Sequence, residues 1–441
     1  MNMDVLIDRY LESYRHEIVD AVCRLIQVPS VCAQSTLDYP YGMDCARALD
    51  FCMDLADRKG LLVYNYDYHC ARADLPTERA GRQILFAAHA DVVPPDIRGR
   101  FPPFSGTVQG DYIIGRGAVD NKAPLIAALY ALAFFRQYNI SLKNRFSLLI
   151  GSDGESGMRD MDYYLTRAGQ PNLAIIPLSG FPVVKGEPGL LRFSVSGPLS
   201  PDITALRCQK QPQCLYPESC SIVFHPKGEA PQELRFERAE RNPIACALRA
   251  CYQRRIPLFG PEQDMELLVL VNNACPFRMM EEFQEEVDII PTQLQMEEGR
   301  RGKMSFQLYF SKDLERVRKQ IQKIFQRSNL HLEIEHASPP CLLRDSDPVI
   351  RTLTDLCSRE SGIRYSPCVM RRGTTYARKF SYACGFGAGC PAEKKPFPPG
   401  YGGSHGPDEA HSIRTLLHAV RLYIKAVWEL DTCDWDGMRG V

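Results

Sequence analysis

The sequence predicts an α/β domain that is interrupted by an α+β insertion. Strand-like and helix-like apolar segments alternate through residues 1–189 and return over 341–441, as in a largely parallel sheet covered by helices. Between them, residues 190–340 combine extended segments with two clear helical patterns. We therefore expect 1–189 and 341–441 to form one domain and 190–340 to form another.

Helical periodicity and buried strand patterns define the first α/β segment. Leu11 and Ile18 belong to an apolar stripe that stops at Pro29, as expected for an amphipathic helix. The segment NKAPLIAALYALAFFRQYN is apolar on nearly every face, which indicates a helix buried against a sheet. The expected elements are helices at 4–28, 41–59 and 121–139 and strands at 61–68, 82–89 and 145–153.

The insertion and the C-terminal segment are predicted in the same way. Helical patterns cover 242–255 and 313–327, and the α/β part ends in a helix at 410–429. The segments PEQDMELLVLVNNA and MSFQLYF resemble strands. The insertion is therefore expected to be an α+β domain.

Composition excludes several classes of protein. The 441 residues are 45% hydrophobic and 24% charged, with 53 basic and 53 acidic side chains, so no net field attracts nucleic acid or an anionic membrane. We expect no apolar run of membrane-spanning length, and the N-terminus lacks the pattern of a secretory signal. The 17 cysteines include no C-x-x-C pair, which favours reduced thiols in the cytoplasm.

A histidine and several carboxylates lie where strands and turns end. His89 and Asp91 are two residues apart at the end of a strand, so both side chains point to one side. Such a carboxylate can orient a metal-binding imidazole, although a polar strand end has the same pattern. Asp120 follows a glycine-rich turn, where it suits either a metal site or a helix cap.

Two further segments carry candidate ligands. Asp153 and Glu155 follow the strand at 145–153, at the edge where α/β sheets bind ligands. His405 lies in a glycine-rich loop and is followed by Asp408 and Glu409, and a simple surface turn explains that loop equally well.

Taken in order, five motifs resemble one family. HADVVP, GRGAVDNKAP, GSDGESG, RGTTYAR and SHGPDEAHS are similar to those of the zinc-dependent aminoacylase and dipeptidase family of exopeptidases, and closest to bacterial dipeptidases of the carnosinase type. The resemblance spans both α/β segments. It implies a metallopeptidase-type catalytic domain with an inserted lid domain at 190–340, and a two-zinc site that hydrolyses a peptide or amide bond.

The resemblance also implies a role for each matched residue. His89 would bind one zinc ion, and Asp91 would orient it. Asp120 would bridge the two ions, while Glu155 and His405 would complete the second position. This set of nitrogen and carboxylate oxygen donors suits zinc.

Two positions of the site depart from the family pattern. The family has a glutamate general base immediately before the glutamate ligand, and this chain has Gly154 there. Losing a general base typically costs about 10²–10⁴-fold in rate. The family also has an aspartate ligand to the first ion after a proline, and this chain has Leu178. Only His89 and Asp120 would remain for the first ion, fewer than the three or four protein ligands of most zinc sites.

The substrate-binding segments are partly kept. Thr374, Thr375 and Arg378 match the segment that lines the family's site, and Arg378 could bind a carboxylate through a bidentate pair. In the insertion, the expected histidine before the helix at 242–255 is missing, and His225 lies too early to replace it. Tyr309 occupies the place expected for a substrate-binding arginine.

Two hypotheses follow from these departures. A degenerate relative would bind a small peptide, an amino-acid derivative or a partner protein, with at most one zinc ion, at Asp120, Glu155 and His405, and would hydrolyse dipeptides very slowly or not at all. An active one-zinc hydrolase would need a relocated base, for which Asp153 and Glu409 are the candidates. The sequence leaves the substrate and the oligomeric state open.

Overall fold

The chain forms two compact units in a computed structural model. Unit 1 comprises residues 1–187 and 342–441, and unit 2 comprises 188–341. The structure describes residues 2–96, 98–178, 180, 182–210, 217–237, 242–271, 288–311, 313–326, 328–370, 373–387 and 396–433.

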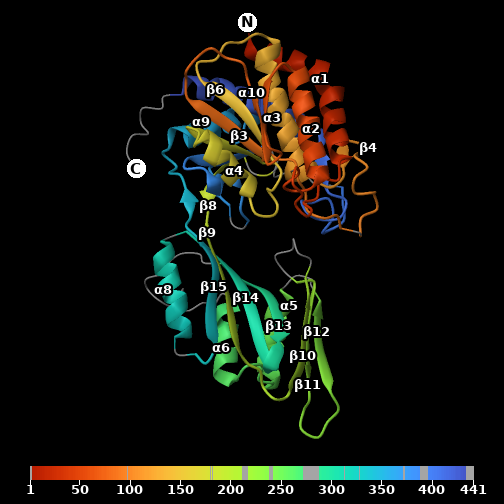
Figure 1. Ribbon diagram of the computed structural model, residues 1–441, viewed down its shortest axis with the longest axis vertical. Helices are drawn as coiled ribbons and strands as arrows, with labels where there is room; N and C mark the ends of the chain where they lie inside the picture. Colours follow the sequence, from red (N-terminus) through yellow and green to blue (C-terminus); the bar gives the residue numbers. More distant parts are fainter. Residues whose placement is uncertain are drawn as a thin grey trace. The chain divides into compact units, whose positions relative to one another are not determined.

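Unit 1 is built on a nine-stranded mixed sheet (Figure 1). The strand order is β1-β2-β6-β3-β7-β18-β8-β16, and β17 pairs with β8. The central run β6-β3-β7-β18 and the pair β17–β8 are parallel, and the pairs β1–β2, β2–β6 and β18–β8 are antiparallel. The sheet is thus less parallel than expected. Its strands are β1 Leu62–Tyr66, β2 Cys70–Asp74, β3 Gln83–His89, β6 Arg145–Gly151, β7 Leu173–Leu178, β8 Val183–Glu187, β16 Cys341–Leu342, β17 Cys368–Val369 and β18 Ala383–Gly387.

A small antiparallel sheet and several helices complete unit 1. The small sheet has the order β19-β5-β4. Its strands are β4 Thr107–Gln109, β5 Tyr112–Ile114 and β19 Ala410–Ser412. The helices are α1 Met3–Ile26, α2 Met43–Arg58, η1 Ala118–Lys122, α3 Ala123–Gln137, α4 Arg159–Ala168, α9 Pro348–Ser361, η3 Tyr376–Lys379 and α10 Ile413–Thr432. The helices expected from the sequence in this unit are present, with shifted ends.

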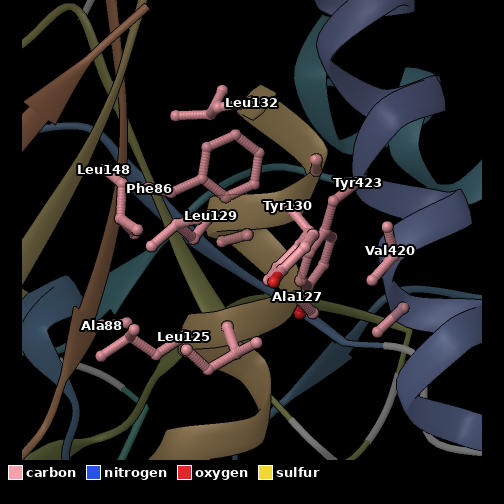
Figure 2. Close-up of a cluster of buried hydrophobic side chains, with 14 of the residues drawn as sticks. Phe86, Ala88, Leu125, Ala127, Leu129, Tyr130, Leu132, Leu148, Val420 and Tyr423 are labelled. Carbon is pink, nitrogen blue, oxygen red and sulfur yellow. The ribbon is translucent and has the colours of Figure 1, made fainter. Parts of the chain in front are cut away.

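The α3 helix is the centre of the main core (Figure 2). It lies between one face of the sheet, represented by Phe86, and α10, represented by Tyr423. The helical stretch Ala118–Gln137 is long and apolar enough to cross a membrane, contrary to our expectation for the sequence, but 89% of its apolar window is buried inside the protein. Its apolar character therefore serves the core, as the pattern on all its faces predicts.

The opposite face of the sheet carries a smaller apolar cluster, formed with α4 and η3. Leu85 and Ala87 of β3 belong to this cluster. Because side chains alternate along a strand, the next residue on this face is His89, at the end of β3. The candidate site therefore lies on the side of the sheet that α4 and η3 cover.

Unit 2 contains two antiparallel sheets and, among its described residues, three α-helices and one short 3₁₀ helix. The sheet orders are β10-β11-β12 and β13-β14-β9-β15. Its elements are β9 Gly189–Pro198, β10 Ile203–Gln209, β11 Ser219–Phe224, β12 Gln232–Glu237, α5 Pro243–Arg254, α6 Pro261–Val271, β13 Asp288–Glu297, η2 Glu298–Arg300, β14 Arg301–Phe310, α8 Leu314–Phe325 and β15 His331–Ser338.

One predicted element of unit 2 was wrong. The segment expected as a strand from residue 261 forms α6, a helix. Pro261 begins it, and Glu262 and Asp264 lie in its first turn, which are helix-start signals. A short apolar run does not by itself distinguish a strand from a buried helix. The end of the quoted segment, 272–274, lies outside the described residues.

Candidate metal centre

Three neighbouring parallel strands end at the same edge of the sheet. His89 ends β3 and pairs in register with Gly151, which ends β6. On the other side, Phe86 pairs with Ile175 of β7, and continuing this register places Leu178 level with His89. Carboxyl ends of parallel strands are where α/β sheets bind ligands, so this edge is the natural place for a site.

The imidazole of His89 is held from both sides. Its Nδ1 lies 3.0 Å from the backbone carbonyl oxygen of Asp91 and 3.3 Å from the Asp91 carboxylate. Its Nε2 lies 3.3 Å from Oδ1 of Asp120. Burial lowers the pKa of His89, but the hydrogen bonds to Asp120 and Asp91 outweigh burial and raise this pKa well above its usual value.

The buried Asp91 carboxylate also holds the turn after β6. Its Oδ1 accepts a hydrogen bond from the backbone N–H of Gly154 at 2.9 Å, and its Oδ2 accepts one from Glu155 at 3.0 Å. Asp91 thus connects His89 to the segment that carries Glu155, which agrees with the orienting role that the resemblance implies.

A second histidine faces the same carboxylates. The Nε2 of His405 lies 3.0 Å from Oε1 of Glu155 and 3.4 Å from Oδ2 of Asp120. Burial lowers the pKa of His405, but the bonds to Asp120 and Glu155 outweigh burial and raise it to about 10. In turn, burial raises the pKa of Asp120, and the hydrogen bonds from His405 and His89 outweigh that effect and lower it strongly.

These side chains fit a metal ion. Ligand atoms of His89, Asp120 and Glu155 all lie within 4.8 Å of one another, and His405 contacts two of the three. Imidazole nitrogens and carboxylate oxygens are ordinary zinc donors. The structure therefore brings together the four side chains that the sequence nominated as ligands, all within unit 1.

Glu409 fixes the backbone at Asp120. Its Oε1 accepts hydrogen bonds from the backbone N–H groups of Val119 at 2.8 Å and Asp120 at 3.0 Å. Its Oε2 lies 2.5 Å from the buried guanidinium of Arg116. The neighbouring Asp408 accepts backbone hydrogen bonds from Arg100 and Phe101. Both acids of this loop therefore hold backbone in place.

At position 154, the backbone has closed against His89. A Cβ atom built on Gly154 would lie 2.5 Å from Cγ of His89, closer than atoms in proteins approach. The family's glutamate could therefore enter only if the turn or the imidazole moved. Glycine at this position removes an acid–base group and also permits a close approach.

At position 178, an apolar contact stands where the family has a ligand. Leu178 packs against the small apolar cluster on the α4 side of the sheet. Its Cδ1 would lie 2.5 Å from a Cβ atom built on Gly385 of the paired strand β18. The leucine therefore fills space beside a glycine.

Asp153, a candidate for a relocated base, is held in an ion pair with Arg159. Its carboxylate is buried and accepts hydrogen bonds from Nε and Nη2 of Arg159 at 2.8 and 2.9 Å and from the Arg159 backbone N–H at 2.9 Å. The other candidate, Glu409, is committed to Arg116 and two backbone amides. The donors around both carboxylates leave them poorly suited to accept a proton from substrate water.

The segment RGTTYAR meets a buried glutamate that the sequence did not single out. Nε of Arg378 lies 3.0 Å from Oε2 of Glu187, and the backbone N–H of Thr375 donates to Oε1 at 2.9 Å. Thr374 is half-buried beside them. The guanidinium expected to bind a substrate carboxylate thus already has an internal carboxylate partner.

The two nominated residues of the insertion lie in unit 2. Tyr309 is buried in β14, and its hydroxyl donates to Oε1 of Gln307 at 3.0 Å. His225 follows β11 and is exposed, and its backbone N–H donates to the carbonyl of Asp202 at 2.8 Å.

Sequence reasoning missed Asp160 and Tyr376, two residues close to the centre. Asp160 is fully buried and accepts a hydrogen bond from the hydroxyl of Tyr376, whose ring meets the ring of His89 with centroids 5.9 Å apart. The available signals were Gly151 at the strand end and an aromatic residue inside a motif segment, and both are weak without the fold.

Comparison with known proteins places the chain in a family. The model of peptidase family M20/M25/M40 matches residues 85–429. The chain belongs to this family. A provisionally named dipeptidase of Staphylococcus aureus (strain USA300) is 31% identical over 188 residues, or 42% of this chain. That match spans only 39% of the relative, and the same values hold for a second provisionally named dipeptidase from strain NCTC 8325.

Two solved structures share the fold along nearly the whole chain. Human carnosine dipeptidase 1 has a TM-score of 0.63 at 15% identity, covering 97% of this chain and 98% of that one. The dipeptidase Dug1p from Saccharomyces cerevisiae has a TM-score of 0.63 at 11% identity, with the same coverage. These likenesses confirm the predicted α/β fold with its inserted domain.

Proposed function

We propose that this M20-family chain keeps the peptidase scaffold and one metal position but hydrolyses dipeptides very slowly or not at all. The observation that carries the proposal is at position 154, where the backbone of Gly154 lies against His89 and offers no acid–base group. Asp153 and Glu409, the candidate replacements, are committed to Arg159 and Arg116. A missing general base alone typically costs about 10²–10⁴-fold.

The proposed metal is a single zinc ion held by Asp120, Glu155 and His405. Nε2 of His405 is within 3.4 Å of both carboxylates, whereas Nε2 of His89 lies 3.3 Å from Asp120. Leu178 contributes no donor to the other position. When bound, zinc supplies Lewis-acid polarisation of a carbonyl group.

The residues of the chain then define what the site can do. Asp120, Glu155 and His405 would bind the ion, and Asp91 would keep His89 oriented beside it. No side chain at position 154 would take a proton from water or deliver one to a leaving amine. Binding is thus supported better than turnover.

The proposed ligand is a small peptide or amino-acid derivative. This class follows from the family and from the names of its relatives, which are dipeptidases. Unit 2 would act as the lid. We place the chain in the cytoplasm, which suits the free thiols of all 14 cysteines that the structure describes.

Metal analysis with an activity panel tests the proposal. Purified protein should bind at most one zinc ion per chain, and the Glu155→Gln variant should bind none. The metal-replete natural protein should show no dipeptide turnover near the ordinary enzyme range of about 1–10³ s⁻¹. Two ions per chain, or ordinary turnover, would refute it, and turnover with one ion would support the one-zinc hydrolase with a relocated base.

A further inference from the structure

Four consecutive backbone amides lead from the end of β6 to the ligand Glu155, and two buried carboxylates bind all four. The N–H groups of Ser152 and Asp153 donate to Oδ2 of Asp160 at 2.8 and 3.0 Å. The next two, of Gly154 and Glu155, donate to Asp91. Asp160 therefore holds the first half of the turn as Asp91 holds the second.

The same oxygen of Asp160 reaches the other side of the centre through Tyr376. The Tyr376 hydroxyl donates a hydrogen bond to Oδ2 of Asp160. The Tyr376 ring packs against the His89 imidazole in a T-shaped arrangement, with an interplanar angle of 78°. One carboxylate thus connects the turn that presents Glu155 with the wall against which His89 packs.

Gly151 makes room for this arrangement. A Cβ atom built on Gly151 would lie 2.0 Å from the Tyr376 hydroxyl oxygen and 2.3 Å from Oδ2 of Asp160. Only glycine permits the phenol and the carboxylate to approach the strand end this closely. The contact between Asp160 and Tyr376 therefore depends on the glycine at position 151 as well as on the two side chains.

Burying this carboxylate is costly. Burial and the nearby charge of Asp91 raise the pKa of Asp160 to about 7, so the ionised form loses free energy in this position. Three donors on one oxygen offset part of that loss. An apolar residue would avoid the cost if α4 needed only packing here.

We propose that Asp160, acting with Tyr376, is a positioning residue of the metal centre. It fixes the turn at residues 152–155, which carries Glu155, and it fixes the Tyr376 ring, against which His89 packs. This inference rests on the proposed function, because it assigns a consequence for metal binding. Partners that orient metal ligands from outside typically change metal affinity about 10–100-fold when they are removed.

The first test is zinc affinity of folded protein, measured by competition with a chelator. Asp160→Asn should weaken zinc binding about 10–100-fold, and Tyr376→Phe, which keeps the ring, should weaken it less. Asp162→Asn is the matched control, because Asp162 lies on the same helix, is 58% exposed and pairs with Lys379. Unchanged zinc affinity in folded Asp160→Asn would overturn the inference, even if that variant melts at a lower temperature.

The second test needs no metal. Amide hydrogen exchange at residues 152–155 should accelerate at all four positions in Asp160→Asn if the turn is held as one unit. Acceleration confined to the amides of Ser152 and Asp153 would show that Asp160 does not help to hold the backbone at Glu155, and it would overturn the inference. If the natural protein binds two zinc ions or hydrolyses dipeptides at an ordinary rate, the proposed function fails, and the exchange pattern still decides the role of Asp160.

Discussion

The two halves of the metal centre differ in what surrounds Asp120. On one side, Oδ2 of Asp120 faces His405, which also contacts Glu155. On the other, Oδ1 faces His89, whose neighbours include the closed backbone of Gly154, while Leu178 packs against Gly385. Charged donors face Asp120 in one half, and in the other half the backbone of Gly154 and the apolar side chain of Leu178 pack closely. The loss of chemistry that we propose would therefore be accompanied by close packing.

Removal of the shared carboxylate should have the largest effect on the donor-rich half. Asp120→Asn should weaken zinc binding by more than the roughly 100-fold that an outer partner costs, because Asp120 contacts both histidines. Isothermal titration with zinc measures the change, with Asp162→Asn as the control. An Asp120→Asn variant that binds zinc normally would contradict the assignment of this half.

Protons should compete with zinc for His405 in the half of the centre that contains Glu155. His405 has a pKa raised to about 10, so below that pH it is protonated and must lose a proton to bind metal. Zinc affinity should therefore rise as pH rises, about tenfold per unit, or about 100-fold from pH 6 to 8. A slope near two would indicate that His89 also loses its proton and serves as a ligand.

Enlarging position 154 tests the repacked half. Gly154→Ala should destabilise the protein by about 1–3 kcal/mol, since its Cβ would meet His89 at 2.5 Å. Thermal or urea unfolding measures this, with Gly403→Ala as a control, because a Cβ there meets open space. An unchanged free energy of unfolding would show that the His89 side chain can shift to accommodate the added methyl group without loss of stability.

Restoring the family residues is expected to do little for the same reason. The double variant Gly154→Glu with Leu178→Asp should not reach ordinary dipeptide turnover, because the turn at 153–155 has closed against His89. A rate panel with zinc-loaded protein measures this. If the double variant turns over and the natural protein does not, the scaffold has lost its chemistry without losing the space for it.

The smallest effect on zinc affinity is expected at Leu178 alone. Leu178→Ala removes an apolar contact and no metal donor, so zinc affinity should change less than about threefold while stability falls by about 2–4 kcal/mol. A large loss of zinc affinity would place Leu178 closer to the ion than we propose.

Ordered motifs made the fold and the ligand set predictable. The apolar patterns of β3 and β6 predicted the strands, and the resemblance to the family nominated His89, Asp120, Glu155 and His405, whose side chains the structure brings together. The α6 helix escaped prediction because a short apolar run fits either a strand or a helix.

Partners of buried polar groups were beyond the sequence. Nothing in local pattern shows that Arg159 binds Asp153, that Glu187 binds Arg378, or that Asp160 reaches Tyr376 across 216 residues. Such pairings depend on which elements meet in space, and close approaches such as that at Gly154 depend on tenths of an ångström of backbone position.

The strand order of unit 1 has a consequence for synthesis. β18 lies between β7 and β8 in the sheet, yet it follows the whole of unit 2 in the chain. A growing chain must therefore hold β7 with one unpaired edge until residue 387 is made. At roughly 5–20 residues per second, that wait lasts on the order of 10–40 s. Unpaired apolar strand edges invite aggregation, so early folding of unit 2, which would shorten the span to be closed, would protect the nascent sheet.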